Sequence, residues 1–305
     1  MVQANPAIQT KKNQRLEIAE GLTAAADFYG DPGARPALLL HGGGQTRHSW
    51  SGTAERLAEA GWYAVTVDAR GHGQSDWAQD GNYHTTGFRD DLIEIASRFE
   101  IPPVLIGASM GGISSLLAIH EWKQRPSSGS EQHSQQRPEL ASALVLVDIA
   151  TRMESKGAVR IMDFMRGGME GFESLEAVAD SVAAYNPHRP RPKDISGLEK
   201  NLRRGEDGRY HWHWDPAFMS SDPGASDEFV NESTLDAAAA ALEVPTLLVR
   251  GKMSDLLSED GARAFLDQVP HAEFADVSGA GHMVAGDRND LFSEAVLRFL
   301  EKEDA

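Results

Sequence analysis

The chain has 305 residues, of which 41% are hydrophobic, which suffices for one large domain or for a core with an inserted segment. Its 46 acidic and 29 basic residues give a formal charge of −17, which argues against nucleic acid or an anionic membrane surface as a partner. The absence of cysteine excludes disulfides, thiolate metal sites and catalysis by a cysteine nucleophile.

The amino terminus gives no targeting signal. Residues 1–6 (MVQANP) lack the basic start and the continuous apolar run of a signal peptide. No stretch approaches the ~20 apolar residues of a membrane span. We therefore expect a cytoplasmic protein that binds a small molecule, with its oligomeric state left open.

Strand and helix patterns alternate along the chain. Residues 1–14 are polar and expected to be loose, and a hairpin is expected around Gly21. Apolar runs predict buried strands at residues 37–40, 62–67, 104–106, 143–147, 244–249 and 272–277. Helical spacing predicts helices at residues 51–60, 85–100, 113–122, 259–268 and 289–300. This alternation indicates an α/β fold with a mostly parallel sheet.

Three consecutive glycines follow the strand at residues 37–40. Ligands bind at the carboxyl ends of strands in open parallel sheets, and glycine leaves the backbone N–H groups accessible there. We expect the N–H of Gly43 to stabilise an oxyanion, with Gly44 as the competing candidate. A phosphate-binding loop is disfavoured because no Gly-Lys-Ser/Thr follows. The turn histidines His41 and His48 are expected to be structural hydrogen-bonding groups.

Residues 107–111 (GASMG) match G-x-S-x-G, the nucleophile elbow. A tight strand-to-helix turn would hold the Ser109 hydroxyl above the sheet edge, and it needs small residues on both sides. The start of the following helix offers the Met110 N–H as a second oxyanion donor. By itself the pentapeptide is also compatible with an ordinary glycine-rich turn.

The alternation stops between residues 151 and 241, where three helical stretches at 153–169, 174–185 and 195–204 predict a lid over the strand ends. Within it, Trp212 and Trp214 are expected to pack in the lid and to form an aromatic wall of the substrate pocket. His211, His213 and Asp215 also permit a metal site, which we disfavour because a third strong ligand is missing. The polar residues 123–138 predict a surface insertion.

Ser109, Asp255 and His282 each follow a predicted strand. The carboxyl ends of parallel strands share one sheet edge, so these residues can converge as nucleophile, acid and base. Asp148 also ends a strand and is a rival for the acid. Asp260 is a weaker rival because it falls inside a helix.

With these motifs in order, the chain resembles the α/β-hydrolase family over nearly its whole length. The resemblance rests on residues 41–44 (HGGG), 68–75 (DARGHGQS), 107–112 (GASMGG) and 279–282 (GAGH). It implies a hydrolase core over residues 1–150 and 242–305, a helical cap over 151–241, and Ser109, Asp255 and His282 as catalytic triad. Some family members take the acid from the position of Asp148. The family often has a proline where Gly44 stands.

The resemblance implies a serine hydrolase of a small, partly hydrophobic carboxylic ester or lactone, without a cofactor. Two alternatives share these motifs: a C–C bond hydrolase of the meta-cleavage type, and a non-catalytic small-molecule-binding protein of the same fold. The serine nucleophile argues against epoxide hydrolases and haloalkane dehalogenases, whose relatives use an aspartate.

Overall fold

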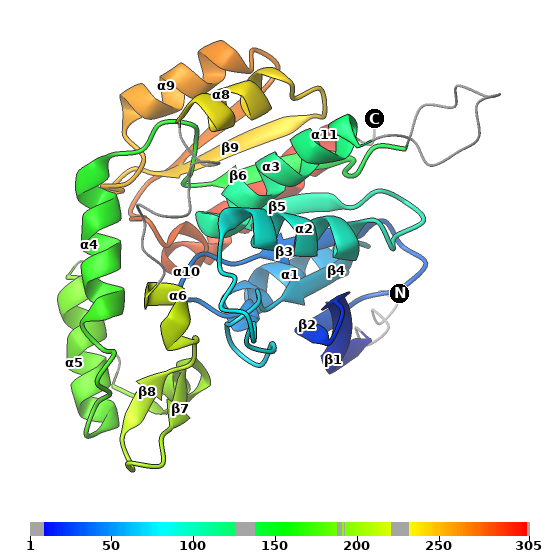
Figure 1. Ribbon diagram of the computed structural model, residues 1–305. Helices are drawn as coiled ribbons and strands as arrows, with labels where there is room; N and C mark the ends of the chain where they lie inside the picture. Colours follow the sequence, from blue (N-terminus) through cyan, green and yellow to red (C-terminus); the bar gives the residue numbers. More distant parts are fainter. Residues whose placement is uncertain (1–8, 126–137, 188–190, 192, 221–231, 304–305) are drawn as a thin grey trace, which may run out of the picture.

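The computed structural model describes residues 9–125, 138–187, 191, 193–220 and 232–303. Within these residues, eight strands form the central sheet in the order β1-β2-β4-β3-β5-β6-β9-β10 (Figure 1). The strands are β1 (Thr10–Ala19), β2 (Leu22–Tyr29), β3 (Pro36–Leu40), β4 (Tyr63–Val67), β5 (Val104–Ala108), β6 (Ala143–Val147), β9 (Thr246–Gly251) and β10 (Glu273–Val277). β2 runs antiparallel to β1 and β4, and the other neighbouring pairs are parallel, which confirms the predicted sheet.

Helices cover both faces of this sheet. One face carries α2 (Thr85–Ala96), α3 (Met110–Gln124), α8 (Glu232–Ala240) and α9 (Glu259–Gln268). The opposite face carries α1 (Ser51–Glu59) and α11 (Asn289–Glu303). Two short helices, η1 (Arg47–Trp50) and α10 (Val284–Asp287), lie beside them.

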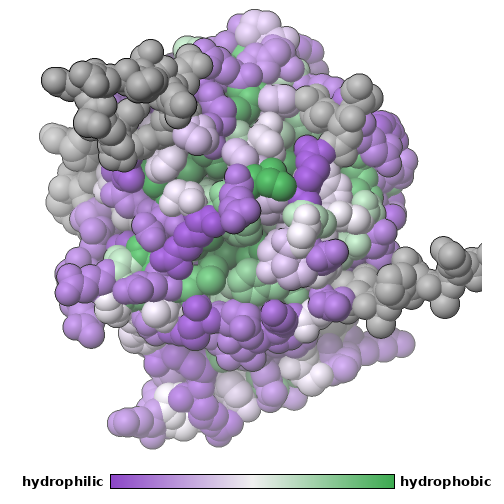
Figure 2. All heavy atoms as spheres, turned by 90° about the vertical axis from the view of Figure 1, so that its right-hand side faces the viewer, coloured by the Kyte–Doolittle hydropathy of each residue, from purple (hydrophilic) through white to green (hydrophobic). Residues whose placement is uncertain are grey.

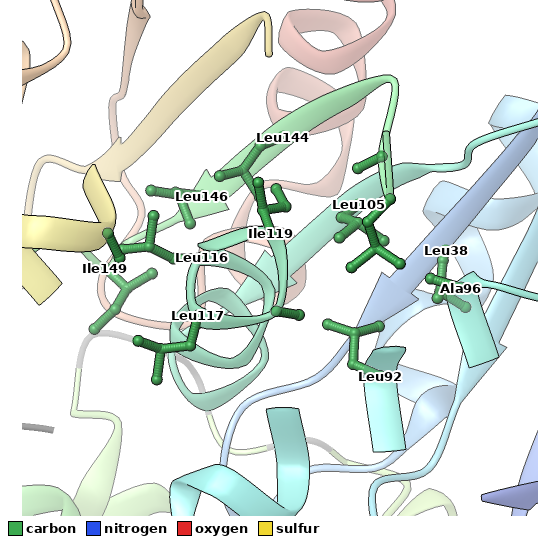
Figure 3. Close-up of a cluster of buried hydrophobic side chains, with 14 of the residues drawn as sticks. Leu38, Leu92, Ala96, Leu105, Leu116, Leu117, Ile119, Leu144, Leu146 and Ile149 are labelled. Carbon is green, nitrogen blue, oxygen red and sulfur yellow. The ribbon is translucent and has the colours of Figure 1, made fainter. Parts of the chain in front are cut away.

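The central strands β3, β5 and β6 consist only of apolar residues and one glycine, because both of their faces are buried. In β5, Leu105 points to the α3 face and Ile106 to the α11 face, and both are fully buried. Figure 3 shows the cluster on the α3 face, where Ile119 of α3 lies near Leu144 and Leu116 lies near Leu146 of the sheet.

A second packed unit lies at one end of the sheet, at the left of Figure 1. We call residues 155–220 the cap. Its elements are α4 (Ser155–Arg166), α5 (Leu175–Tyr185), η2 (Ser196–Asn201), β7 (Leu202–Arg204), β8 (Tyr210–Trp212) and α6 (Pro216–Ser220). They share a separate hydrophobic cluster centred on Met165, Val178, Trp212, Trp214 and Met219. By contrast, Leu235 and Ala238 of α8, within the segment expected to form the cap, pack in the core cluster beside α3.

Two local expectations are wrong. The helix expected at residues 195–204 is a 3₁₀ turn followed by an antiparallel hairpin of β7 and β8. Gly205 and Gly208 lie in its turn, and Gly208 has a positive φ of 74°. Residues 10–14 are not loose, because they pair with β2 as part of β1. Most of the expected insertion at 123–138 lies outside the described residues.

Hydrophilic residues cover most of the face seen in Figure 2, and hydrophobic residues show mainly near its middle. In the described part of the chain, no helix combines the length and apolarity needed to cross a bilayer.

Candidate active site

Ser109 occupies a sharp turn between β5 and α3. Its φ of 48° and ψ of −115° are unusual for a residue with a side chain and are typical of strained functional turns. A Cβ atom at Gly107 would lie 2.4 Å from the Gly111 carbonyl oxygen, and one at Gly111 would lie 2.5 Å from that of Leu40. The strand, the turn and the helix therefore meet only because these positions are glycine, as the sequence pattern predicts.

His282 lies after β10, and its imidazole is bound to a buried carboxylate. Its Nδ1 lies 2.7 Å from Oδ2 of Asp148, which is fully buried at the end of β6. Asp148 also accepts hydrogen bonds from the Gly251 N–H at 3.0 Å and from the Ser254 hydroxyl at 2.5 Å. Since Nδ1 faces the carboxylate, the ring carries a proton there and Nε2 remains available as an acceptor.

The prediction that Asp255 pairs with His282 is wrong, because Asp148 is the carboxylate that contacts the imidazole. Asp255 instead accepts a hydrogen bond from the Arg160 guanidinium of α4 at 2.8 Å, and its side chain is 37% exposed. Asp148 follows β6 directly with a positive φ of 51°, whereas Asp255 lies four positions beyond β9, in a loop that reaches the cap. The other rival, Asp260, lies exposed in the first turn of α9.

Ser109 and His282 line one cavity of about 370 Å³. The cap supplies its apolar wall, with Ile161, Met162, Phe164 and Met165 from α4 and Phe218 and Met219 from α6. Its lining, among the described residues, contains no lysine or arginine. The Tyr185 phenol in this wall has a raised pKa because it is buried. The cavity therefore joins a serine and a histidine to a largely neutral, apolar surface.

Gly43 and Gly44 line the same cavity, but their backbone N–H groups differ in their hydrogen bonds. The Gly44 N–H donates to His72 Nε2 at 3.2 Å and is therefore already used. Within the described chain, the Gly43 N–H has no acceptor. The Met110 N–H begins α3, where helix N–H groups lack an intrahelical acceptor. Gly43 and Met110 thus retain the donors expected of an oxyanion site, and Gly44 contributes surface.

The two expected pocket tryptophans lie elsewhere. Trp212 and Trp214 stack on each other with ring centroids 5.0 Å apart and are buried in the cap cluster. They line a neighbouring hollow of about 290 Å³ rather than the Ser109 cavity. The Trp214 ring nevertheless packs against the active-site loop, since a Cβ atom at Gly44 would lie 3.3 Å from it.

The histidines of the same segment diverge. His211 bonds Asp207 at the surface, whereas His213 turns inward to the backbone of Gly73 and Gly44. Among the described residues, no group of three or more histidine or acidic side chains could hold a metal ion.

A family model described as the alpha/beta hydrolase fold matches residues 36–288. The chain belongs to the α/β-hydrolase family.

Several curated relatives resemble this α/β-hydrolase over most of their length. The esterase Rv0045c of Mycobacterium tuberculosis is 28% identical, with 88% of this chain and 84% of the relative covered. A 3-hydroxybutyrate-oligomer hydrolase of Cupriavidus necator is 26% identical, with 83% and 85% covered. An Escherichia coli 2-hydroxy-6-oxononadienedioate/2-hydroxy-6-oxononatrienedioate hydrolase is 24% identical, with 97% and 98% covered.

Solved structures agree on the fold. An E-2-(acetamidomethylene)succinate hydrolase superposes with a TM-score of 0.78 at 21% identity, covering 96% of this chain and all of that one. The M. tuberculosis esterase superposes with a TM-score of 0.73 at 24% identity, covering 98% and 93%.

The sequence pattern of this α/β-hydrolase does not single out Ser254, and it marks His213 only as a disfavoured metal ligand. Ser254 could have been noticed as the hydroxyl next to Asp255 in a strand-end loop. The contacts that His213 makes with the backbone of Gly73 and Gly44 leave no signal in the sequence, because these partners are far away along the chain.

Proposed function

We propose that this chain is a serine hydrolase that cleaves a neutral, partly hydrophobic carboxylic ester or lactone. The observation that carries the proposal is the 2.7 Å contact between His282 Nδ1 and buried Asp148, with His282 lining the same cavity as Ser109. The esterase homologues support the same reaction class.

In the proposed mechanism, His282 Nε2 takes the Ser109 proton while Oγ attacks the ester carbonyl carbon. Asp148 stabilises the resulting imidazolium. The N–H groups of Gly43 and Met110 receive the tetrahedral oxyanion. Collapse expels the alcohol, which takes the proton from His282 and leaves an acyl-Ser109. Water then attacks the acyl carbon, gives a proton to His282 and releases the acid, and Ser109 recovers its proton.

The lining of the cavity supports a neutral substrate. Its wall consists mainly of methionine, phenylalanine and isoleucine side chains, which favour apolar acyl groups. A carboxylate placed there would lose its hydration without a lysine or arginine partner among the described lining residues, which is costly.

The second candidate is C–C bond hydrolysis, favoured by the similarity to the E. coli hydrolase. That relative is named for dioate substrates, which carry two carboxylates. The absence of a cationic side chain from the described cavity lining supports the ester over a dianionic substrate.

The test is hydrolysis of p-nitrophenyl esters from acetate to octanoate by the wild type and by Ser109→Ala. The proposal predicts turnover that disappears in Ser109→Ala and is fastest with an acyl chain longer than acetate. Ser115→Ala is the matched control, since this buried serine of α3 only bonds the Gly111 carbonyl at 2.7 Å. It should keep the activity.

A preference restricted to acetate would contradict the apolar acyl site. Turnover of a vinylogous diketo diacid much faster than of any ester would establish the C–C hydrolase instead. Persistent ester hydrolysis in Ser109→Ala would contradict the serine mechanism itself.

A further inference from the structure

Three buried histidines surround the Gly42–Gly44 loop without taking part in the proposed chemistry. His41 directly follows β3, His72 lies in the loop after β4, and His213 comes from the cap after β8. Their exposed fractions are 1%, 0% and 4%. The rings of His41 and His72 lie 5.3 Å apart, and those of His72 and His213 lie 5.8 Å apart.

His213 joins two loops of the core through its two ring nitrogens. Its Nδ1 accepts a hydrogen bond from the Gly73 N–H at 2.7 Å. Because that nitrogen is an acceptor, Nε2 carries the ring proton and donates to the Gly44 carbonyl at 3.2 Å. The bond from Gly73 therefore requires the neutral imidazole, because a protonated ring cannot accept at Nδ1. Burial, together with the nearby His41, lowers the pKa of His213 to about 4, so this form prevails at neutral pH.

His72 holds the other backbone group of the same glycine. Its Nε2 accepts from the Gly44 N–H, and its Nδ1 donates to the Arg70 carbonyl at 3.0 Å. Imidazoles thus fix Gly44 at both its N–H and its carbonyl. Gly44 has a φ of +72°, which glycine adopts readily but which still needs outside contacts to be selected.

The preceding residue, Gly43, carries the proposed oxyanion donor. The Gly43 N–H belongs to the same planar peptide as the Gly42 carbonyl, so its direction follows from how that carbonyl is held. His41 Nδ1 donates to this carbonyl at 2.8 Å, and the Gln45 N–H donates to it at 3.1 Å. Residues on both sides of Gly43, namely His41 and Gln45, therefore fix the direction of its N–H.

We propose that His213 is a positioning residue through which the cap fixes the oxyanion loop, by its hydrogen bond to the Gly44 carbonyl. The inference rests on the proposed function, since it concerns the donor that Gly43 supplies to the oxyanion. His213 does not line the Ser109 cavity and acts only through the backbone. Loss of this bond should reduce the rate of acyl transfer more than it weakens substrate binding.

Two substitutions separate the two hydrogen bonds of His213. In His213→Gln the terminal amide reaches the position of Nε2 and can still donate to the Gly44 carbonyl. In His213→Asn the shorter amide reaches only the position of Nδ1, so it keeps the Gly73 bond and loses the Gly44 bond. His211→Gln, on the same hairpin but bonded to surface Asp207, is the control.

For p-nitrophenyl ester hydrolysis, we expect His213→Asn to lose about tenfold or more in kcat with little change in KM, since misdirected oxyanion donors act on the transition state. His213→Gln should stay within about threefold of the wild type, like the control. Equal losses of kcat in His213→Asn and His213→Gln, or none in His213→Asn, would overturn the proposal.

Hydrogen–deuterium exchange of the peptide spanning residues 38–50 supplies a readout that does not depend on activity. Faster exchange in His213→Asn than in His213→Gln and the wild type supports the proposal, and equal protection in both variants overturns it. If the wild type hydrolyses esters through Ser109 but His213→Asn and His213→Gln do not differ in kcat or in exchange, only this inference fails. If the wild type is inert while the exchange separates the variants, the proposed function fails and the coupling of cap and loop stands.

Discussion

Acid should destabilise this protein through its buried imidazoles, and His213 allows the size of the effect to be worked out. Its folded-state pKa of about 4 lies below the ordinary histidine value of 6.5, because burial penalises the charged ring and His41 repels it. The unfolded chain therefore binds a proton more readily than the folded chain does. The stability that this residue contributes is complete above pH 6.5 and is lost as the pH falls toward 4.

The interval between the ordinary pKa of 6.5 and the folded-state pKa of about 4 corresponds to about 3 kcal/mol over the whole range. Between about pH 7.5 and about pH 5 the linkage relation gives a loss of about 2 kcal/mol from His213 alone. Burial also lowers the pKa values of His41 and His72, so the wild type should lose more than this.

The assay is urea unfolding of the wild type and of His213→Gln at both pH values. Glutamine does not titrate, so the difference between the two pH values should be about 2 kcal/mol smaller in the variant. Comparing differences removes any pH-independent cost of the substitution. An equal loss of stability in both proteins would refute the assignment of a buried, neutral His213.

Two further substitutions test the surroundings of the site. Ser254→Ala removes one of the hydrogen bonds to Asp148. We expect kcat/KM of ester hydrolysis to fall about fivefold, which corresponds to about 1 kcal/mol. An unchanged kcat/KM would mean that Ser254 does not hold the carboxylate. Gly107→Ala places a Cβ 2.4 Å from the Gly111 carbonyl, and the overpacking should cost about 1–3 kcal/mol of stability. Thermal unfolding measures this cost, and an unaltered Tm would contradict the crowding at the turn.

The regular part of the fold could be predicted from the sequence because its signals are local. The central strands are continuous apolar runs, and the amphipathic helix α9 begins and ends where the pattern predicts. The glycines around Ser109 likewise indicate a crowded turn directly. Each of these features depends on residues close together in the chain.

The cap was predicted less well because tertiary contacts decide its structure. Residues 202–204 pair with residues 210–212, and helical spacing alone does not reveal this pairing. Trp212 and Trp214 were expected at the substrate because aromatic residues suit a pocket wall. In the structure they stack on each other and pack in the cap cluster with residues of α4.

The identity of the acid could not be decided from strand ends alone. β6 and β9 are neighbours, so Asp148 and Asp255 both follow strands that end at the same edge. The difference lies in how far each residue is from its strand end and in the competing partner, Arg160, that the cap offers to Asp255.

The most direct test of the proposed Ser109–His282–Asp148 mechanism compares Asp148→Asn with Asp255→Asn in ester hydrolysis. Both substitutions remove a charge and conserve volume. Asp148→Asn should lower kcat by about 10²–10⁴-fold, because the amide no longer holds the His282 tautomer or stabilises the imidazolium. Asp255→Asn should change kcat by less than about threefold, since it breaks only a half-exposed ion pair with Arg160. Full activity in Asp148→Asn, with a large loss in Asp255→Asn, would contradict this mechanism.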